Sequence, residues 1–264
     1  MNLPPPHQSF LDRALPRLQA DPRILGVAGA GSLITGTMDQ YSDLDLVVVS
    51  RSADSAAVAC ERRALVEGLG PLLASFTGEH VGEPRLLICL YHRPLLHVDV
   101  KFVSLDEFAE RIENPVVIWE RGAELTAVIK KTPPVHPMPD LQWIEDRFWI
   151  WVHYAALRLG RGELFELLDF LGFLRQVVFG PLSLVQHGQL PRGVRRLETL
   201  APRHLEAMKK TVASYDRDSC ISAIRAAITL YRELRSEISN PSLIRRSEAE
   251  AAAVRYFEEM ALAT

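Results

Sequence analysis

The sequence has few of the residues that build disulfide frameworks or cysteine-based metal sites. Its 264 residues include three cysteines, Cys60, Cys89 and Cys220, which are odd in number and widely spaced, without a Cys-x-x-Cys pair. Such a set is typical of reduced, buried thiols in a cytoplasmic protein. Residues 1–10 are rich in proline and lack the basic-then-apolar pattern of a secretion signal. We therefore expect a cytoplasmic protein.

Long apolar runs and an excess of positive charge are also missing. No uninterrupted apolar run approaches the roughly 20 residues that a membrane span needs, so we expect no membrane association. The formal net charge is -3, from 30 basic and 33 acidic residues. Without a global positive field, nucleic acid is an unfavoured partner. The hydrophobic share of 48% is that of an ordinary globular protein, and the length suits one large or two small domains.

The first half of the chain alternates short apolar runs with helical patterns. Valine-rich or glycine-bounded apolar runs predict strands, and mixed faces of alanine, leucine and charge predict helices. The predicted strands are 24–30, 44–49, 86–90, 95–103 and a last one at 125–129; the predicted helices are 54–69 and 105–112. Strands and helices in this order predict an N-terminal domain with a mixed sheet, spanning residues 1–131.

The second half has a different character. Four prolines between Lys130 and Asp140 cannot lie inside a helix or a central strand, and they predict a semi-rigid linker. Helical patterns then follow almost to the end, at 141–159, 163–179, 219–238 and 242–262. We therefore predict an α+β protein whose mixed-sheet domain is followed by an all-α helical bundle at residues 138–264.

The most informative stretch is a glycine-rich turn followed by two acids. Gly31 and Ser32 follow a predicted buried strand, where a glycine lets the backbone approach a phosphate and a hydroxyl donates to it. Asp43 and Asp45 are two residues apart at the start of the next strand, so both carboxylates point to the same face. Carboxylates this close repel each other unless a cation lies between them, and oxygen ligands of this kind suit Mg²⁺.

A third acid completes the predicted metal site. Asp99 lies in the middle of an otherwise apolar strand, where a carboxylate is costly unless it is paired or binds a metal. If that strand lies beside the one with Asp43 and Asp45, all three carboxylates converge. Three acids can hold two metal ions about 3.5–4 Å apart, as in enzymes that catalyse in-line displacement at phosphorus.

These motifs resemble the nucleotidyltransferase superfamily, the polymerase-beta-like fold. Its pattern is Gly-Ser, a spacer of roughly ten residues, Asp-x-Asp and a later acid on a neighbouring strand, matched here by Gly31-Ser32, Asp43-Leu-Asp45 and Asp99. The run from Val98 to Leu125, with Phe-Val-Ser-Leu-Asp-Glu-Phe and Trp-Glu-Arg-Gly, looks more narrowly like the bacterial aminoglycoside adenylyltransferases. So do the two-domain layout and the Tyr154–Leu164 segment.

The resemblance implies an enzyme that transfers a nucleoside monophosphate, AMP from ATP or from another nucleoside triphosphate, to a hydroxyl of an aminoglycoside-like acceptor. Asp43, Asp45 and Asp99 would hold two Mg²⁺ ions, and Gly31 and Ser32 would hold the triphosphate. The sequence departs from many relatives in one place. Thr35 stands where they carry a basic residue, so one triphosphate contact is either absent or supplied from elsewhere, for example by Lys101, Lys130 or an arginine of the helical bundle. Thr35 and Lys101 are the two further residues that we expect to contact the nucleotide.

The acceptor site and two alternative functions stay open at this stage. The resemblance and the position of Arg161 and Glu163 between two predicted helices suggest that these residues contact the acceptor. One alternative is transfer to tRNA or to a protein, as in toxin-type relatives. The other is a binding module of the same fold without catalysis. The sequence also leaves open whether a second subunit completes the site, as in a homodimer.

Overall fold

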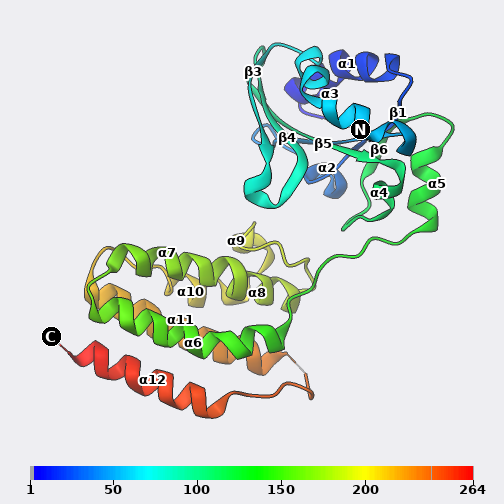
Figure 1. Ribbon diagram of the computed structural model, residues 1–264. Coiled ribbons are helices and arrows are strands. Elements are labelled where there is room, and N and C mark those ends of the chain that lie inside the picture. The colour runs from blue at the N-terminus through cyan, green and yellow to red at the C-terminus, as the bar shows by residue number, and fades with distance from the viewer. Residues whose placement is uncertain (1–2, 239, 264) are drawn as a thin grey trace. The chain divides into compact units, whose positions relative to one another are not determined.

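The computed structural model describes residues 3–238 and 240–263, and the chain divides into two compact units, Met1–His136 and Pro137–Thr264 (Figure 1). The first unit is built on a six-stranded sheet in the order β3-β4-β5-β2-β1-β6. Its strands are β1 (Ile24–Gly29), β2 (Leu44–Ser50), β3 (Leu72–Gly78), β4 (Glu83–Tyr91), β5 (Leu96–Ser104) and β6 (Val116–Glu120). Neighbours β2 and β5 are parallel, and the other neighbouring pairs are antiparallel. The unit is thus the mixed α+β fold that the sequence predicts.

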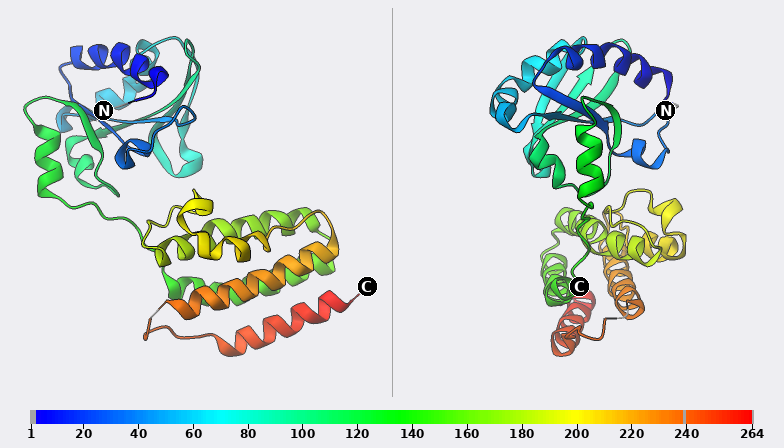
Figure 2. Two further views of the ribbon diagram at one scale, coloured as in Figure 1. Left: turned by 180° about the vertical axis from the view of Figure 1, so that it is seen from behind. Right: turned by 90° about the vertical axis from the view of Figure 1, so that its right-hand side faces the viewer.

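Two layers of helices cover this sheet, as the views in Figure 2 show. Helices α1 (Pro5–Ala20) and α3 (Ser55–Gly68) pack on one face, where Phe10 of α1 and Val58 of α3 join a core of alternate strand residues. Helices α4 (Leu105–Ala109) and α5 (Glu124–Lys131) pack on the other face through Phe108 and Leu125. This second layer contacts mainly β1, β2 and the end of β5, so the rest of that face is left for a site.

The structure corrects the predicted last strand. Residues 125–129 lie in α5, and the last strand is β6, nine residues earlier at its start. The apolar residues Leu125, Val128 and Ile129 are spaced i, i+3 and i+4 and all pack against the same core cluster, which is the spacing of a helix face. A five-residue apolar run is too short for periodicity to separate strand from helix, and here tertiary packing decided it.

Two further elements were not anticipated from the sequence. Helix α1 begins at Pro5, where a proline suits the first helical turn because the missing N–H has no partner there anyway. Its apolar residues Phe10, Leu11, Ala14 and Leu18 form a buried stripe in spite of Pro16. Strand β3 is the second, and its mixture of buried and exposed residues hides the alternation that identifies a strand.

The second unit is all-helical, in agreement with the sequence. Its helices are α6 (Leu141–Gly160), α7 (Leu164–Leu174), α8 (Gly180–Gln186), α9 (Leu197–Leu200), α10 (Leu205–Lys209), α11 (Arg217–Glu237) and α12 (Ser247–Leu262), with a π-helical turn at Arg175–Phe179. Phe148 of α6 and Tyr231 of α11 stack at 3.9 Å between ring centroids in the middle of the core.

One helical run of this unit has the length and composition of a membrane span, although charged residues such as Glu166 and Asp169 interrupt it. This run, Leu164–Gln186, comprises α7, the π-turn and α8. Half of its most apolar window is buried, and Leu167, Leu171 and Leu182 lie in the core of the bundle. A core helix of a soluble bundle has the same composition, so the run is weak evidence for a membrane.

Candidate active site

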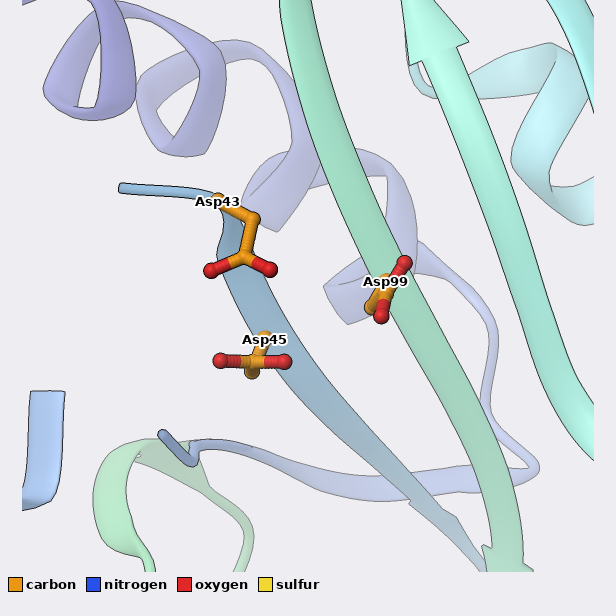
Figure 3. Close-up of side chains that lie close together, drawn as sticks. All are labelled: Asp43, Asp45 and Asp99. Carbon is orange, nitrogen blue, oxygen red and sulfur yellow. The ribbon is translucent and has the colours of Figure 1, made fainter. Parts of the chain in front are cut away.

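Strand pairing brings together the three acids that the sequence selected. Asp45 of β2 lies directly opposite Asp99 of the parallel strand β5, and Asp43 precedes β2 by one residue. One carboxylate oxygen from each lies within 4.8 Å of the others, and all three residues are half-buried. Figure 3 shows the three side chains on the same side of the two strands. Three hard oxygen ligands at this spacing could hold a divalent cation.

The electrostatics of this acidic triad favour a positively charged ligand. Burial raises the pKa of the Asp99 carboxyl, the neighbouring His97 lowers it, and the negative charge of Asp43 raises it again. His97 lies two residues before Asp99 on β5, and its Nε2 is 2.8 Å from Asp99 Oδ1. The alternation of His97 with Asp99 along the strand already places both side chains on the same face in the sequence.

Gly31 is held in close contact with the triad. Its φ is +56°, and a Cβ at this position would lie only 1.9 Å from Asp45 Oδ2. The backbone N–H of the preceding Ala30 donates to the carbonyl oxygen of Asp45 at 2.9 Å. The turn after β1 therefore packs tightly on the Asp45 side chain. Only glycine fits at this position, because the φ is positive and because a Cβ would collide with the carboxylate. This geometry gives a physical reason for the Gly-Ser motif beside the acids.

Ser32 begins the short helix α2 (Ser32–Thr35). Its Oγ is buried and has no hydrogen bond within residues 3–238 and 240–263. A buried hydroxyl of this kind costs free energy unless a ligand completes it. Thr35 behaves differently, because its Oγ1 donates to the Ser32 carbonyl oxygen at 3.3 Å and lies 2.7 Å from Thr37 Oγ1. Among the two hydroxyls of α2, that of Ser32 is therefore the better phosphate donor.

Lys101 lies on the same strand as Asp99, two residues further along, but its ammonium group has a protein partner. Its Nζ is 2.6 Å from Glu83 Oε2, and Arg85 donates to the same carboxylate at 2.7 Å. The hydrogen bond from Arg85 and then Lys101 lower the pKa of Glu83 to about 2. A triphosphate contact by Lys101 would have to compete with this ion pair, and the predicted contact stays a prediction.

The two residues predicted to contact the acceptor belong to the second unit. Arg161 directly follows α6, and Glu163 directly precedes α7. Glu163 Oε2 forms an ion pair with Arg158 Nη1 at 2.5 Å, and Arg161 Nη1 lies 3.8 Å from Glu163 Oε1. The Arg158 hydrogen bond lowers the pKa of Glu163, which therefore stays ionised. A role of this ion-pair cluster in acceptor binding stays a prediction.

Comparison with known proteins gives similarity at the level of structure. No protein-family model and no curated protein matches the sequence. The chain is similar to the crystal structure of an aminoglycoside 6-adenyltransferase from Bacillus subtilis, with 15% identity, a TM-score of 0.40 and coverage of 97% of this chain and 99% of that one. It is also similar to a nucleotidyltransferase-like protein from Exiguobacterium sibiricum, with 13% identity, a TM-score of 0.32 and coverage of 94% and 78%. Likeness at this level says nothing of substrate or mechanism.

Proposed function

We propose that this chain is a magnesium-dependent nucleotidyltransferase, which moves a nucleoside monophosphate, AMP from ATP, to a hydroxyl of a small-molecule acceptor and releases pyrophosphate. The observation that carries the proposal is the acidic triad: three carboxylates whose oxygens lie within 4.8 Å of one another, on adjacent parallel strands. Like charges at this distance repel one another, and a cation between them relieves that repulsion. Their spacing suits the metal-assisted displacement that the sequence motifs imply.

The residues around the triad fit a metal-bound triphosphate in three respects. The donor set is all carboxylate oxygen, which suits Mg²⁺ better than soft metals. Gly31 has no Cβ, so its backbone lies in close contact with the Asp45 carboxylate. The orphaned hydroxyl of Ser32 supplies a hydrogen-bond donor on that side of the site. A triphosphate bound here would therefore meet a bound cation, a close backbone approach at Gly31 and the hydroxyl donor of Ser32.

Each residue has a role in the proposed reaction. Asp43 and Asp45 hold the Mg²⁺ that accompanies the nucleotide, while Gly31 and Ser32 position the triphosphate. Bound Mg²⁺ would neutralise negative charge on the phosphates and on the three acids. Asp99 lies at the other side of the triad, where its raised pKa and its contact with His97 suit a second ion or the proton of the acceptor hydroxyl. Catalysis is then mainly positioning and charge neutralisation.

The test combines binding and turnover. Isothermal calorimetry should show ATP binding with Mg²⁺ and none with excess chelator, because three carboxylates repel an unneutralised triphosphate. Pyrophosphate release should then depend on an added acceptor, and the resemblance to aminoglycoside adenylyltransferases names aminoglycosides as the first class to assay. Undiminished ATP affinity in chelator would show that the acids do not face the phosphates, and the proposed function would be wrong.

A further inference from the structure

The sheet face that bears the acidic triad continues into an apolar surface. Directly opposed residues on neighbouring strands point to the same face, and the pairing runs from Asp45 to Asp99, from Asp99 to Ile88 and from Ile88 to Phe76. One row of side chains therefore crosses β2, β5, β4 and β3 in that order. It starts with two carboxylates and ends with two apolar side chains.

A second row lies beside the first and has the same character. His97 of β5 is opposite Leu90 of β4, which is opposite Ala74 of β3. Phe76 is 56% and Leu90 38% exposed, and Ile88 is half-buried, so these three side chains face solvent next to His97 and Asp99. We call Phe76, Ile88 and Leu90 the apolar platform. Solvent-facing apolar side chains next to a polar site are typical of a ligand surface.

The order of strands gives the platform a direction relative to the reaction. The phosphate-binding turn at Gly31 and Ser32 follows β1, which pairs with β2 on the side away from β5. The platform lies on β4 and β3, beyond Asp99 on the opposite side of the acids. In an in-line displacement the attacking oxygen and the leaving group lie on opposite sides of the phosphorus. If the triphosphate is held at Ser32, the attacking hydroxyl therefore approaches the phosphorus from the side of Asp99.

We propose that the apolar platform binds the acceptor, and that the acceptor is a hydroxylated small molecule with a flat apolar face beside the reacting hydroxyl. This inference rests on the proposed function and narrows its acceptor class. The molecule carries no anionic group near that hydroxyl, because the three aspartates and the triphosphate would repel it. Strands lie about 4.8 Å apart, so the distance from β5 to β3 is about 10 Å, which accommodates one ring with a short hydroxyl-bearing arm.

The platform can be tested with a probe that contains only these two features. In the full chain with Mg²⁺ and a non-hydrolysable ATP analogue, 2-phenylethanol should shift the methyl NMR signals of Ile88 and Leu90, and myo-inositol should not. Phe76→Ser should weaken 2-phenylethanol binding about fivefold, the scale of one lost aromatic contact. Ile112→Ser is the matched control, since Ile112 is also 56% exposed but lies outside both rows; it should leave binding unchanged.

The outcomes separate this inference from the proposed function. ATP binding that needs Mg²⁺, together with silent Ile88 and Leu90 methyls, would overturn the platform and leave the nucleotidyltransferase intact. Equal shifts with myo-inositol would overturn it as well. Shifts that depend on protein concentration, with a dimer in sedimentation, would show that a second copy covers the platform. Leu90→Ser gives an independent variant, and a loss of probe binding in both variants with an unchanged ATP affinity would support the inference.

Discussion

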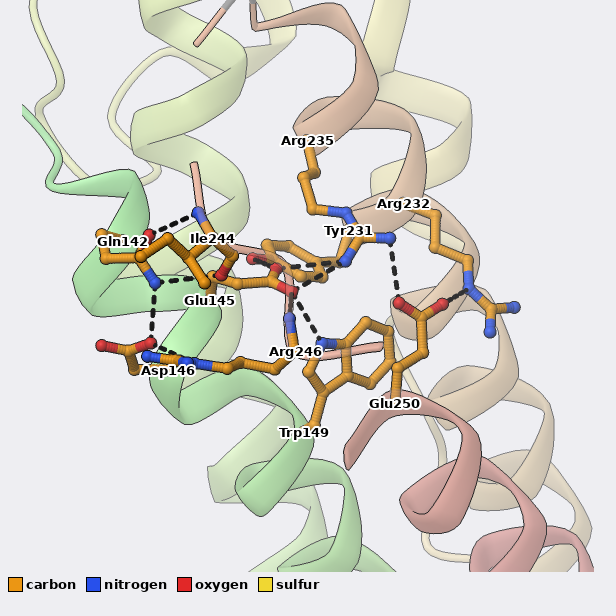
Figure 4. Close-up of polar contacts among 10 residues, drawn as sticks. All are labelled: Gln142, Glu145, Asp146, Trp149, Tyr231, Arg232, Arg235, Ile244, Arg246 and Glu250. Atoms are coloured by element: carbon orange, nitrogen blue, oxygen red, sulfur yellow. Dashed lines mark hydrogen bonds and ion pairs between the residues drawn. The ribbon is translucent and has the colours of Figure 1, made fainter. Parts of the chain in front are cut away.

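The two units each contain a cluster of charged side chains, and the clusters are built in opposite ways. In the helical unit, Glu145 is fully buried but accepts hydrogen bonds from Tyr231 at 2.6 Å, from Arg235 at 3.0 and 3.1 Å, and from Trp149 at 3.2 Å. Arg235 also pairs with Glu250 of α12 at 3.0 Å (Figure 4). Every charge named here faces an opposite charge or a hydrogen-bond donor supplied by the protein.

In the sheet unit, by contrast, three like charges, those of Asp43, Asp45 and Asp99, lie close to one another. The direction of the pKa shifts reflects the difference. Burial alone would raise the pKa of Glu145, yet its donors lower it, whereas the pKa of Asp99 is raised. A cluster in which Arg235 faces Glu145 and Glu250 holds helices together, whereas a cluster of three like charges attracts a cation.

The largest effect should come from Asp45→Ala, which we expect to lower the transfer rate on the order of 10³-fold or more by removing charge stabilisation from the reacting phosphate. The free energy of unfolding without metal should stay the same or rise, because one of three like charges is gone. Pyrophosphate release and chemical denaturation measure the two effects. Asp54→Ala, which removes an acid paired with Arg51 outside the triad, is the control and should change neither rate nor fold. Near-normal turnover in a folded Asp45→Ala protein would refute the metal site.

In the cluster around Glu145, a substitution should lower stability, whereas in the acidic triad it should lower activity. Glu145→Gln leaves Arg235 buried without its full partner, and we expect it to lower the free energy of unfolding of the helical unit by about 3–5 kcal/mol. The next residue in sequence, Asp146, forms an exposed ion pair with Arg246. Asp146→Asn removes this pair and should lower the free energy of unfolding by less than about 1 kcal/mol. Denaturation followed by tryptophan fluorescence compares the two variants, because three of the four tryptophans lie in this unit and only Trp119 lies in the other. Equal costs would show that the buried cluster does not hold the bundle together.

Magnesium should stabilise the sheet unit alone. At a concentration 100 times its dissociation constant, Mg²⁺ should add about 2.7 kcal/mol to the free energy of unfolding of the unit that binds it. Hydrogen exchange should show the added protection in β2 and β5 and little change in α6 and α11. The gain should disappear in Asp45→Ala. Equal protection of both units, or protection that survives Asp45→Ala, would contradict a specific site at the triad.

Two glycines with left-handed conformations offer a smaller and sharper comparison. Gly36 has a φ of +65° and open space at its Cβ position, so Gly36→Ala should cost about 1 kcal/mol from backbone strain alone. Gly31→Ala should cost about 1–3 kcal/mol more, because its Cβ must displace the Asp45 carboxylate. It should also abolish Mg²⁺-dependent ATP binding in calorimetry. Similar behaviour of the two variants would mean that the close approach of Gly31 to Asp45 is unimportant.

The smallest effect separates the two hydroxyls of α2. Ser32→Ala should weaken ATP affinity about tenfold, on the order of 1.4 kcal/mol, without lowering stability, because the hydroxyl has no partner to lose in the described residues. Thr35→Ala should leave ATP affinity nearly unchanged, since the Thr35 hydroxyl bonds within its own turn. Calorimetric titration of both variants with ATP and Mg²⁺ decides between them. A larger loss in Thr35→Ala would favour the role for Thr35 considered from the sequence.

The candidate site was more predictable than the fold around it. Strand alternation places Asp43 and Asp45 on one face from local geometry alone. Asp99 is easily recognised as well, because a carboxylate within an otherwise apolar strand is costly unless it has a partner. The elements that the sequence concealed are those with conflicting local patterns. Residues 125–129 are an apolar run that fits strand or helix, and β3 lacks a regular alternation. For residues 125–129, packing against strand residues distant in sequence decided the structure, and for β3, pairing with the following strand β4 decided it.

The sequence by itself determined an α+β domain followed by a helical bundle, a Gly-Ser turn and three acids of one chemical kind. Local periodicity, proline placement and motif spacing act over a few residues, so they can be recognised along the chain. Only the tertiary structure decided that Asp99 pairs with Asp45, that Gly31 packs on that carboxylate, and that Phe76 shares their face. Strand order and register depend on contacts between segments tens of residues apart, and it is these contacts that turn separate residues into one site.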